Sequence, residues 1–387
     1  MMNILMISPF YSPNIGGVET HLDDLVSELD SRGYKVVVHS YSPITTPGVK
    51  WKSKSAIGKN SIVYRHRWFG KNLFHFVENH PLLDFLYLTP YLLLCVFIYM
   101  LLNKKDIDVI HAHGLNAALI GVFLKKIFKK RLIVSTHAVY KFNSNSTVSK
   151  AVRNILTKAD KILCVSSSSQ DELIRIGIDK NKMDVYKQWI NLDNFSYPEE
   201  NIRKKIRNNI KFDDKFSILF VGRLIKKKGA QYLCEVATML PNINFVFIGS
   251  GPLEYRINNM AEKYNNIKFI GKIKNNELNQ YYQAADLLCV PSQYEEGFPR
   301  VPMEAVSCGL PVIASNIGGK GGLIEMLNDD VAIFIEPTID NIKEEILALY
   351  NDSNRLIALK KNCKNYALSN FSKENINFIM KHYKIVN

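Results

Sequence analysis

The feature that most constrains this chain is a regular alternation of short apolar runs with amphipathic stretches from one end to the other. This pattern is typical of α/β proteins with parallel sheets, because parallel strands need a long crossover connection, usually a helix. We therefore expect two Rossmann-like halves, each built on one series of strands. The first series is Asn3–Ser8, Tyr34–Tyr41, Ile62–His66, Asp108–His113, Arg131–His137 and Lys161–Ser166, and the second is Ser217–Val221, Asn244–Gly249, Ile267–Gly271, Leu287–Ser292, Pro311–Ser315 and Val331–Glu336.

Helices are expected between the strands. Val18–Asp30 carries apolar residues at helical spacing, which predicts a helix with one face on a sheet. Similar stretches are Ala230–Leu240, Asn276–Ala285 and Asp340–Tyr350. Because 387 residues are too many for one small core, we divide the chain into 1–195, 196–370 and a last helical segment, 371–387. A linker is expected near 196–215. Ligands of such sheets bind at the carboxyl ends of the strands, so a cleft between the halves is the expected site.

Positive charge is concentrated in one part of the chain. The formal net charge is +14, and residues 51–150 hold 15 Lys and Arg against 4 Asp and Glu. Such a surface attracts nucleic acid, acidic lipid head groups or a diphosphate-linked acceptor, or it is an ordinary solvated surface. No basic helix interleaved with aromatic residues and no nucleic-acid-binding module is recognisable, which argues against a nucleic-acid partner.

The cysteines and the N-terminus indicate a cytoplasmic protein. The six cysteines include no C-x-x-C pair, and most of them lie inside apolar runs, as reduced core thiols do. The chain starts directly with a strand-like run and has no basic leader, so secretion is not expected.

The segment from Leu82 to Leu102 is almost wholly apolar. Asp84 and Pro90 interrupt its first half, and the uninterrupted run Tyr91–Leu102 is shorter than the about 20 residues of a membrane-spanning helix. A spanning helix is therefore the least favoured interpretation. A buried helix is favoured, and a helix that docks the first domain on a bilayer is the alternative, supported by the lysines that flank the segment.

Two carboxylates frame a loop in the second series. Glu296 and Glu304 have seven residues between them, and Pro302 suits the first turn of a short helix that ends near Gly309. Carboxylates bind pairs of sugar hydroxyls through charge-assisted hydrogen bonds, and N–H groups at a helix start bind phosphate. The helix dipole alone also favours an acidic residue near a helix start, so Glu304 has a purely structural interpretation as well.

This segment resembles the E-x7-E signature of the retaining glycosyltransferases of family 4. The resemblance covers nearly the whole chain, because other family motifs follow in the expected order. It implies a GT-B fold, an α/β architecture of two Rossmann-like β/α/β domains with a central inter-domain cleft. It also implies that the last helix packs back on the N-terminal domain.

The resemblance assigns roles in donor binding. Gly222–Gly229 is similar to the family motif G-R-L-x-x-x-K-G, in which Arg and Lys hold the diphosphate; here they are Arg223 and Lys228. By the same resemblance Glu304 binds the ribose hydroxyls and Glu296 those of the transferred sugar. The loop residues Gly297 and Phe298 belong to the donor site, and the backbone N–H groups of Arg300 and Val301 face the phosphates. Pro299 stands where the family commonly has Gly and has no N–H to donate, which leaves the sugar undetermined.

Further positions match the family less closely. Gly16 and Gly17 resemble the G-G-x-E loop, which faces the donor phosphates and the acceptor, and His137 resembles a T-x-H position near the reacting sugar. Ile273 is a candidate platform for the base. At the domain junction Asn191 stands where the family pattern has Gly. His111 and His113 share one face of a strand without an evident third ligand, so no metal site is expected.

These observations predict a glycosyltransferase that moves a sugar from a UDP- or GDP-sugar to a hydroxyl. Retention of configuration is what the family resemblance implies. No obligatory metal or other cofactor is expected, because Arg223 and Lys228 supply the positive charge. The basic region 51–150 suggests a saccharide or lipid-linked acceptor, as in bacterial surface polysaccharide (lipopolysaccharide) synthesis, and peripheral attachment to the inner face of the cytoplasmic membrane. A nucleotide-sugar epimerase of the same fold is the alternative enzyme.

Overall fold

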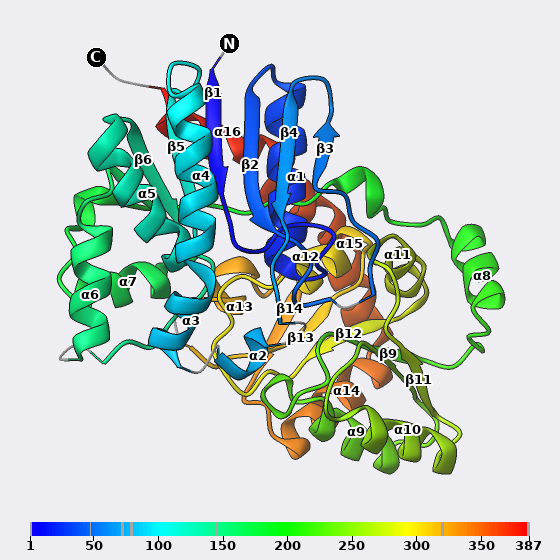
Figure 1. Ribbon diagram of the computed structural model, residues 1–387. Helices are drawn as coiled ribbons and strands as arrows, with labels where there is room; N and C mark the ends of the chain where they lie inside the picture. The colour runs from blue at the N-terminus through cyan, green and yellow to red at the C-terminus, as the bar shows by residue number, and fades with distance from the viewer. Residues whose placement is uncertain are drawn as a thin grey trace. The chain divides into compact units, whose positions relative to one another are not determined.

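The computed structural model describes residues 2–46, 48–70, 73–77, 80–143, 146–318 and 321–384. They form two compact units (Figure 1), Met1–Gln188 with Glu374–Asn387, and Trp189–Lys373. The division lies between Gln188 and Trp189, whereas the sequence places it at 195/196. The stretch expected to be a linker holds a helix of the second unit, α8 (Glu200–Asn209).

The first unit is built on an eight-stranded sheet within the described ranges, with the order β3-β4-β2-β1-β5-β6-β7-β8. All pairs are parallel except β3 with β4. The strands are β1 Asn3–Ile7, β2 Lys35–Tyr41, β3 Lys54–Ile57, β4 Ser61–His66, β5 Val109–His113, β6 Arg131–Ser135, β7 Lys161–Cys164 and β8 Met183–Val185. The helices are α1 Gly17–Ser31, α2 Phe74–Val77, α3 Pro81–Leu88, α4 Pro90–Asn103, α5 Leu115–Phe128, α6 Thr147–Leu156, α7 Ser167–Arg175, the 3₁₀ turn η1 Lys180–Lys182 and α16 Ile376–Tyr383.

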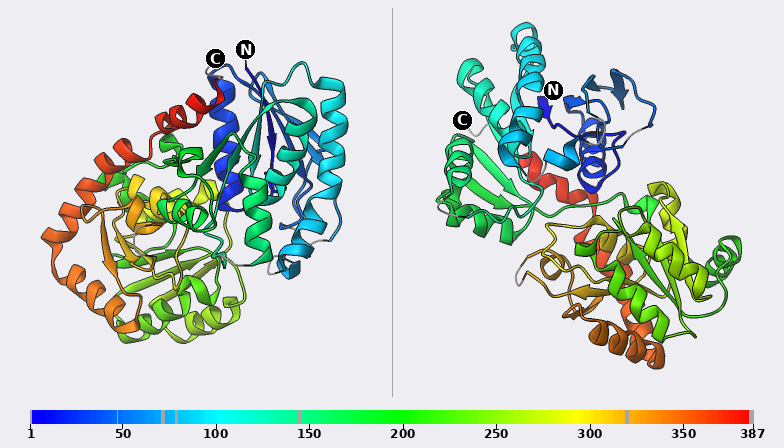
Figure 2. Two further views of the ribbon diagram at one scale, coloured as in Figure 1. Left: turned by 90° about the vertical axis from the view of Figure 1, so that its left-hand side faces the viewer. Right: turned by 60° about the horizontal axis from the view of Figure 1, so that its bottom comes forward.

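Both faces of this sheet are covered. Successive strand residues point to opposite faces, and Leu5 and Ile7 of β1 pack into a core cluster that includes residues of α4 and α5. The C-terminal helix α16 is tied to the other elements of this unit (Figure 2), since the Oη of Tyr383 lies 2.7 Å from Nδ1 of the buried His111. In addition, Arg32 after α1 donates to Asn377 Oδ1 at 2.8 Å. The segment Glu374–Asn387 therefore belongs to the first unit.

The apolar segment from Leu82 is two helices, α3 and α4, which meet at Thr89. Pro90 has no N–H to continue the hydrogen-bond ladder of α3, which explains the break. Leu92, Val96 and Met100 of α4 are fully buried, so the favoured expectation of a buried helix holds for one face of α4. The opposite face is exposed.

The second unit has a six-stranded parallel sheet within the described ranges, with the order β11-β10-β9-β12-β13-β14. Helices cover both faces, because two separate core clusters include alternate residues of the same strands. The strands are β9 Ser217–Val221, β10 Asn244–Ile248, β11 Ile267–Gly271, β12 Leu287–Val290, β13 Val312–Ser315 and β14 Ala332–Ile335. The helices other than α8 are α9 Ala230–Met239, α10 Glu254–Lys263, α11 Asn275–Ala284, α12 Arg300–Ser307, α13 Leu323–Met326, α14 Ile339–Asn351 and α15 Ser353–Asn370, with 3₁₀ turns η2 Leu192–Asn194, η3 Lys226–Lys228 and η4 Lys373–Asn375.

A buried carboxylate ties α8 and α15 to the start of β12. Asp286 Oδ1 accepts hydrogen bonds from Arg203 Nη2 at 2.7 Å and from Lys360 Nζ at 2.9 Å. Arg207 Nη1 lies 3.5 Å from Asp286 Oδ2, which also accepts from the backbone N–H of Ser217 at 3.0 Å. Burial alone would raise the pKa of Asp286, but the charges of Lys360 and Arg203 lower it overall. Asp286 is therefore ionised at neutral pH and anchors two helices.

Candidate functional site

The strand order of the second sheet places a topological switch point between β9 and β12. These strands are neighbours although β10 and β11 separate them in sequence, and the chain proceeds from them to opposite sides of the sheet. Parallel sheets bind ligands outside the carboxyl ends of the strands at such a switch point. The loop Gly222–Gly229 follows β9, and the loop Pro291–Pro299 follows β12. Both loops carry predicted site residues.

These two loops are in close contact. Gly229 has a positive φ of 75°, and a Cβ at this position would lie 2.0 Å from the carbonyl oxygen of Pro291, so only glycine fits. The backbone N–H of Gln293 donates to the carbonyl of Lys227 at 2.7 Å. The close packing fixes the positions from which Lys228 and Glu296 extend.

Lys228 and Glu296 form an ion pair that joins the two loops. Lys228 Nζ donates to Glu296 Oε2, and the hydroxyl of Ser292 donates to Glu296 Oε1. The side chains of Lys228 and Glu296 are 19% and 5% exposed. Burial alone would lower the pKa of Lys228, but the negative charge of Glu296 and the contact with Tyr294 raise it overall. Lys228 is therefore a fixed cation at neutral pH.

Arg223 lies in the same loop and is exposed. The neighbouring backbone is held in place, because the N–H of Leu224 donates to the carbonyl of Ser250 at 2.8 Å. Arg223 forms no ion pair with any residue in the described ranges. Its guanidinium can therefore present its planar set of donors to an anion from solution.

Glu304 is 3% exposed and lies on α12. The Oη of Tyr282 donates to Glu304 Oε2 at 2.9 Å, and Arg300 Nε lies 3.7 Å from Glu304 Oε1. Arg300 Nη1 also donates to the carbonyl of Trp189 at 3.4 Å. Both side chains of this pair thus hold α12 in place, and a contact between Glu304 and a ribose stays a prediction.

The start of α12 lies directly after the Glu296 loop. Its N-cap is Pro299, whose ring has no oxygen to accept from the first N–H groups of the helix. Phe298 and Val301 are half-buried against the core of the second unit, and so is Ile273 after β11. Gly297 lies in the loop between Glu296 and the helix.

Gly16 and Gly17 lie in the first unit, between β1 and α1. Gly16 is the N-cap of α1, and a Cβ on it would lie 2.4 Å from Glu19 Oε2. Gly17 is exposed, and a Cβ on it would meet nothing within 4 Å. The start of α1 is therefore open around Gly17. A loop whose backbone comes close to a ligand needs such an open position.

His137 follows β6 and forms part of a group of histidines. Its Nε2 lies 3.1 Å from Nδ1 of His113, which is 2% exposed. The following loop is held by Glu172, which accepts from the N–H groups of Tyr140 at 2.7 Å and Phe142 at 2.6 Å. Burial lowers the pKa of His137 to about 4, so it is a neutral hydrogen-bonding group at pH 7.

The buried histidines predict a loss of stability in mild acid. Burial lowers the pKa of His111 to about 3 and that of His113 well below its usual value. Because the unfolded chain binds protons near pH 6.5 and the folded chain does not, stability is expected to fall as the pH drops from about 6.5 towards 4. Each such histidine contributes a slope of about 1.4 kcal/mol per pH unit in this window.

Urea unfolding at several pH values measures this slope. The variant His113→Gln should show a shallower slope than the original chain, whatever its stability at pH 7. An unchanged slope would contradict the prediction. Glu19 has the opposite effect on the pH dependence of stability. Burial raises its pKa, so protonation of Glu19 favours the folded state as the pH falls.

Three side chains of the second unit contact the predicted residues, although no sequence motif assigned a role to them. They are Ser292, Tyr294 and Tyr282. Ser292 and Tyr294 lie in the same loop as Glu296, so their proximity in sequence was a signal that could have been used. Tyr282 comes from α11, and no sequence pattern links it to Glu304. Within the described ranges no group of three His, Cys, Asp or Glu side chains is placed to hold a metal ion.

Two family models match the chain and together span most of it. The model described as Glycosyltransferase Family 4 matches residues 15–194, and that described as Glycosyl transferases group 1 matches residues 201–368. The chain belongs to glycosyltransferase family 4. The predicted family is therefore confirmed, and this protein is a glycosyltransferase.

Relatives of this glycosyltransferase occur in several kingdoms. A phosphatidylinositol N-acetylglucosaminyltransferase subunit of Arabidopsis thaliana is 25% identical over 89% of this chain and 73% of its own length. The human protein of the same name is 24% identical over 88% of this chain and 67% of its own length. An uncharacterized glycosyltransferase of Methanocaldococcus jannaschii is 27% identical over 97% of both chains.

Solved structures show the same fold. Anabaena HepE in complex with UDP and glucose has a TM-score of 0.76 at 19% identity, over 99% of both chains. Sucrose-phosphate synthase from Thermosynechococcus elongatus has a TM-score of 0.77 at 22% identity, over 99% of this chain and 98% of its own. The prediction of two parallel-sheet Rossmann-like domains of GT-B type is thereby confirmed.

Proposed function

We propose that this glycosyltransferase binds a UDP- or GDP-sugar at the carboxyl ends of β9 and β12 and transfers the sugar to a hydroxyl with retention of configuration. The observation that carries the proposal is the ion pair of Lys228 with Glu296, with the exposed Arg223 in the same loop as Lys228. A cation next to a carboxylate suits a donor that combines a diphosphate with a sugar. The complex of HepE with UDP and glucose supports this class of ligand.

Each group of the site has a proposed role. Arg223 and Lys228 bind the diphosphate, and the N–H groups of the first turn of α12 add donors that point along the helix axis. Glu296, held in place by Ser292, binds hydroxyls of the transferred sugar. Other assignments stay predictions. They are the contact of Glu304 with ribose, the contact of Ile273 with the base, and the roles of Gly16, Gly17 and His137.

The proposed chemistry needs no nucleophile from the protein. The acceptor hydroxyl attacks the anomeric carbon from the face that the diphosphate leaves, so that the new glycosidic bond has the configuration of the old one. The bond between the anomeric carbon and the phosphate oxygen breaks, and the acceptor proton passes to the departing diphosphate. Arg223 and Lys228 stabilise the negative charge that develops on this leaving group. With two cations in this role, we expect no obligatory metal.

A lipid-linked saccharide is the acceptor that we favour. Relatives of this chain are named for phosphatidylinositol, a lipid. The positive charge of residues 51–150 would attract an acceptor that carries a diphosphate. Assembly of a bacterial surface polysaccharide, at the inner face of the cytoplasmic membrane, is the setting predicted from the sequence.

Stabilisation by nucleotides tests the donor class. A ligand at about 100 times its dissociation constant raises the free energy of unfolding by about 2.7 kcal/mol. We expect UDP or GDP to raise the melting temperature of the protein and the corresponding nucleoside monophosphate to have a much smaller effect, because Arg223 and Lys228 contact the second phosphate. Equal shifts with monophosphate and diphosphate would contradict the proposal.

A further inference from the structure

Large apolar side chains are exposed on three consecutive helices of the first unit. We call this surface the apolar face; Leu102 is 81% exposed and Leu82 is 73% exposed. Large exposed apolar surfaces are uncommon on soluble proteins and mark sites of interaction. The apolar face consists of Leu82, Leu83 and Leu86 on α3, Leu94, Ile98, Leu101 and Leu102 on α4, and Phe123 and Ile127 on α5.

Helix α4 has two apolar sides, and only one of them is buried in the core. Leu92, Val96 and Met100 are fully buried in the core of the first unit. Leu94 and Ile98, at least half exposed, follow the same helical spacing on another side. The segment Leu82–Asn103 is long and apolar enough, with a mean hydropathy of 2.2, to be a candidate membrane span by composition. Within its most apolar window, 33% is buried inside the protein. Spanning would expose the core that α4 covers, so the buried side of α4 argues against a spanning helix.

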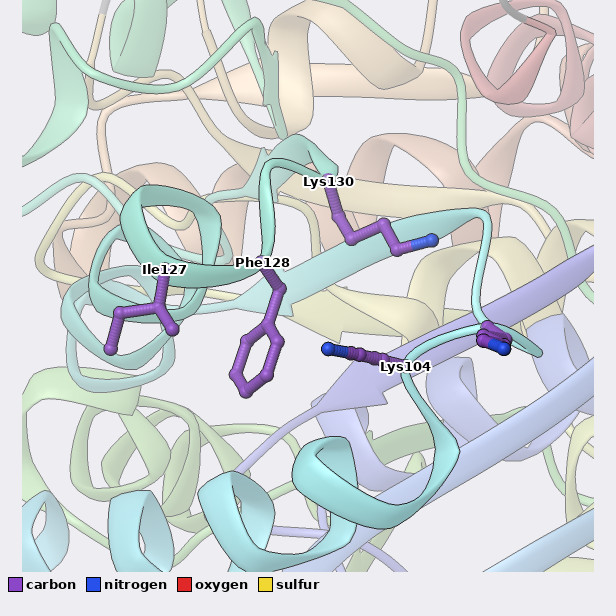
Figure 3. A pocket seen from close by; sticks show the side chains of 5 residues that line it. Lys104, Ile127, Phe128 and Lys130 are labelled. Carbon is purple, nitrogen blue, oxygen red and sulfur yellow. The ribbon is translucent and has the colours of Figure 1, made fainter.

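Lysines lie at the end of the apolar face. Lys104 and Lys105 follow α4 and are exposed, while Lys130 follows α5. Together with Ile127 and Phe128 they line a pocket of about 310 Å³. Figure 3 shows the ammonium groups of Lys104 and Lys130 on the same side of Phe128, whose ring forms an apolar wall beside them. Such a pocket suits a phosphate group attached to an apolar chain.

The charge next to the apolar face is positive. Lys126 and Lys129 are exposed at the end of α5 and extend the group of lysines. Three carboxylates lie nearby: Asp106 is exposed and follows Lys105, Asp84 accepts from Asn116 Nδ2 at 2.8 Å, and Asp108 accepts from the N–H of Asn3 at 2.8 Å. Lys104, Lys105, Lys126, Lys129 and Lys130 outnumber these three carboxylates, so the net charge of this surface is positive.

We propose that the apolar face and the adjoining lysines dock the first unit on a bilayer that contains anionic phospholipids. Helix α4 lies flat in the plane of the interface, its outer leucines enter the boundary between head groups and acyl chains, and Lys104, Lys105 and Lys130 bind lipid phosphates. Stable peripheral attachment needs two signals, and this surface combines apolar area with a basic patch. The proposal rests on the proposed function only in that a lipid-linked acceptor would bring the enzyme to a membrane.

A second copy of the chain fits this surface less well. A symmetric dimer joins the same patch of both protomers, so the interface would bury lysines of both copies. Lysine is depleted at the cores of protein interfaces, because desolvating its strongly hydrated charge is costly. An anionic bilayer instead gives the same lysines phosphate partners while the leucines leave water.

Sedimentation with vesicles tests the proposal, with full-length protein and no nucleotide. We expect binding to vesicles of phosphatidylcholine with phosphatidylglycerol at about 0.1 M NaCl, and much weaker binding to phosphatidylcholine alone or at about 1 M NaCl, where charges are screened within about 3 Å. The double variant Lys104→Glu/Lys130→Glu should reduce binding at least tenfold, about the effect of two lysines at an anionic surface. Ile98→Ser/Leu101→Ser should reduce it by a similar factor.

Matched changes on α15 of the second unit control for net charge and for surface hydrophobicity. Lys361→Glu/Lys364→Glu and Ile357→Ser/Leu368→Ser alter exposed residues of the same types, and both should leave vesicle binding unchanged. Wild-type protein that does not bind, or test and control variants that bind equally, would overturn the proposal. So would a lipid-free dimer that Ile98→Ser/Leu101→Ser abolishes, because a second copy would then cover the apolar face. Since the assay contains no nucleotide and the donor assay no lipid, the two proposals fail separately.

Discussion

Replacing Lys228 by alanine is expected to lower kcat about 10²–10³-fold, the usual cost of removing one preorganised donor to a developing negative charge. The expectation follows from the position of Lys228, whose ammonium is held by Glu296 beside the switch point of the second sheet. The pair also fixes the carboxylate, so Glu296 would lose its charge partner in the variant. Turnover with purified protein and a nucleotide sugar measures the effect. Binding of UDP or GDP should weaken in parallel.

The adjacent Lys227 is the matched control. It lies in the same 3₁₀ turn, carries the same charge and is exposed. Lys227→Ala should therefore keep turnover close to that of the original protein. If both variants had the same activity, the role assigned to Lys228 would be wrong, and positive charge in this turn would act only through long-range attraction.

Replacing Asp286 by asparagine is expected to lower the free energy of unfolding of the second unit by about 3–5 kcal/mol, as is typical when one partner of a buried ion pair is removed. Arg203, Arg207 and Lys360 all converge on this carboxylate, which is 7% exposed. Asparagine keeps the shape but removes the negative charge that these three cations share. Burial already lowers the pKa of Lys360 despite Asp286. Urea unfolding followed by circular dichroism measures the loss.

An exposed ion pair of the same unit provides the comparison. Arg256 Nη2 lies 2.6 Å from Glu235 Oε1, but the two side chains are 49% and 41% exposed. Glu235→Gln should cost about 0–1 kcal/mol, because solvent screens such pairs. Similar losses for the two variants would show that Asp286 does not anchor α8 and α15.

The sequence predicts the central strands well, because each is a continuous apolar run between polar stretches. The peripheral strands were missed for physical reasons. Lys54–Ile57 pairs antiparallel with β4 at the sheet edge and alternates exposed with half-buried residues, and Met183–Val185 is very short. Helix α15 has a signal that could have been used, since its buried Leu356, Leu359, Cys363 and Ala367 share one helical face.

The candidate site could be predicted only in part. The motif resemblance located Lys228 and Glu296, and the structure brings their side chains into contact. Contacts such as that of Tyr282 with Glu304 depend on how α11 packs against α12, which no local pattern specifies. The burial of Arg300 could not be predicted from a local pattern either. Its side chain contacts the carbonyl of Trp189, which is more than a hundred positions away in sequence.

A crystal structure of the protein with a bound nucleoside diphosphate would show directly which side chains hold the phosphates. We expect the phosphate oxygens to lie within hydrogen-bonding distance of Arg223 and Lys228, at the carboxyl end of β9. A diphosphate bound at a place where neither side chain can reach it would show that these two residues are not the donor site.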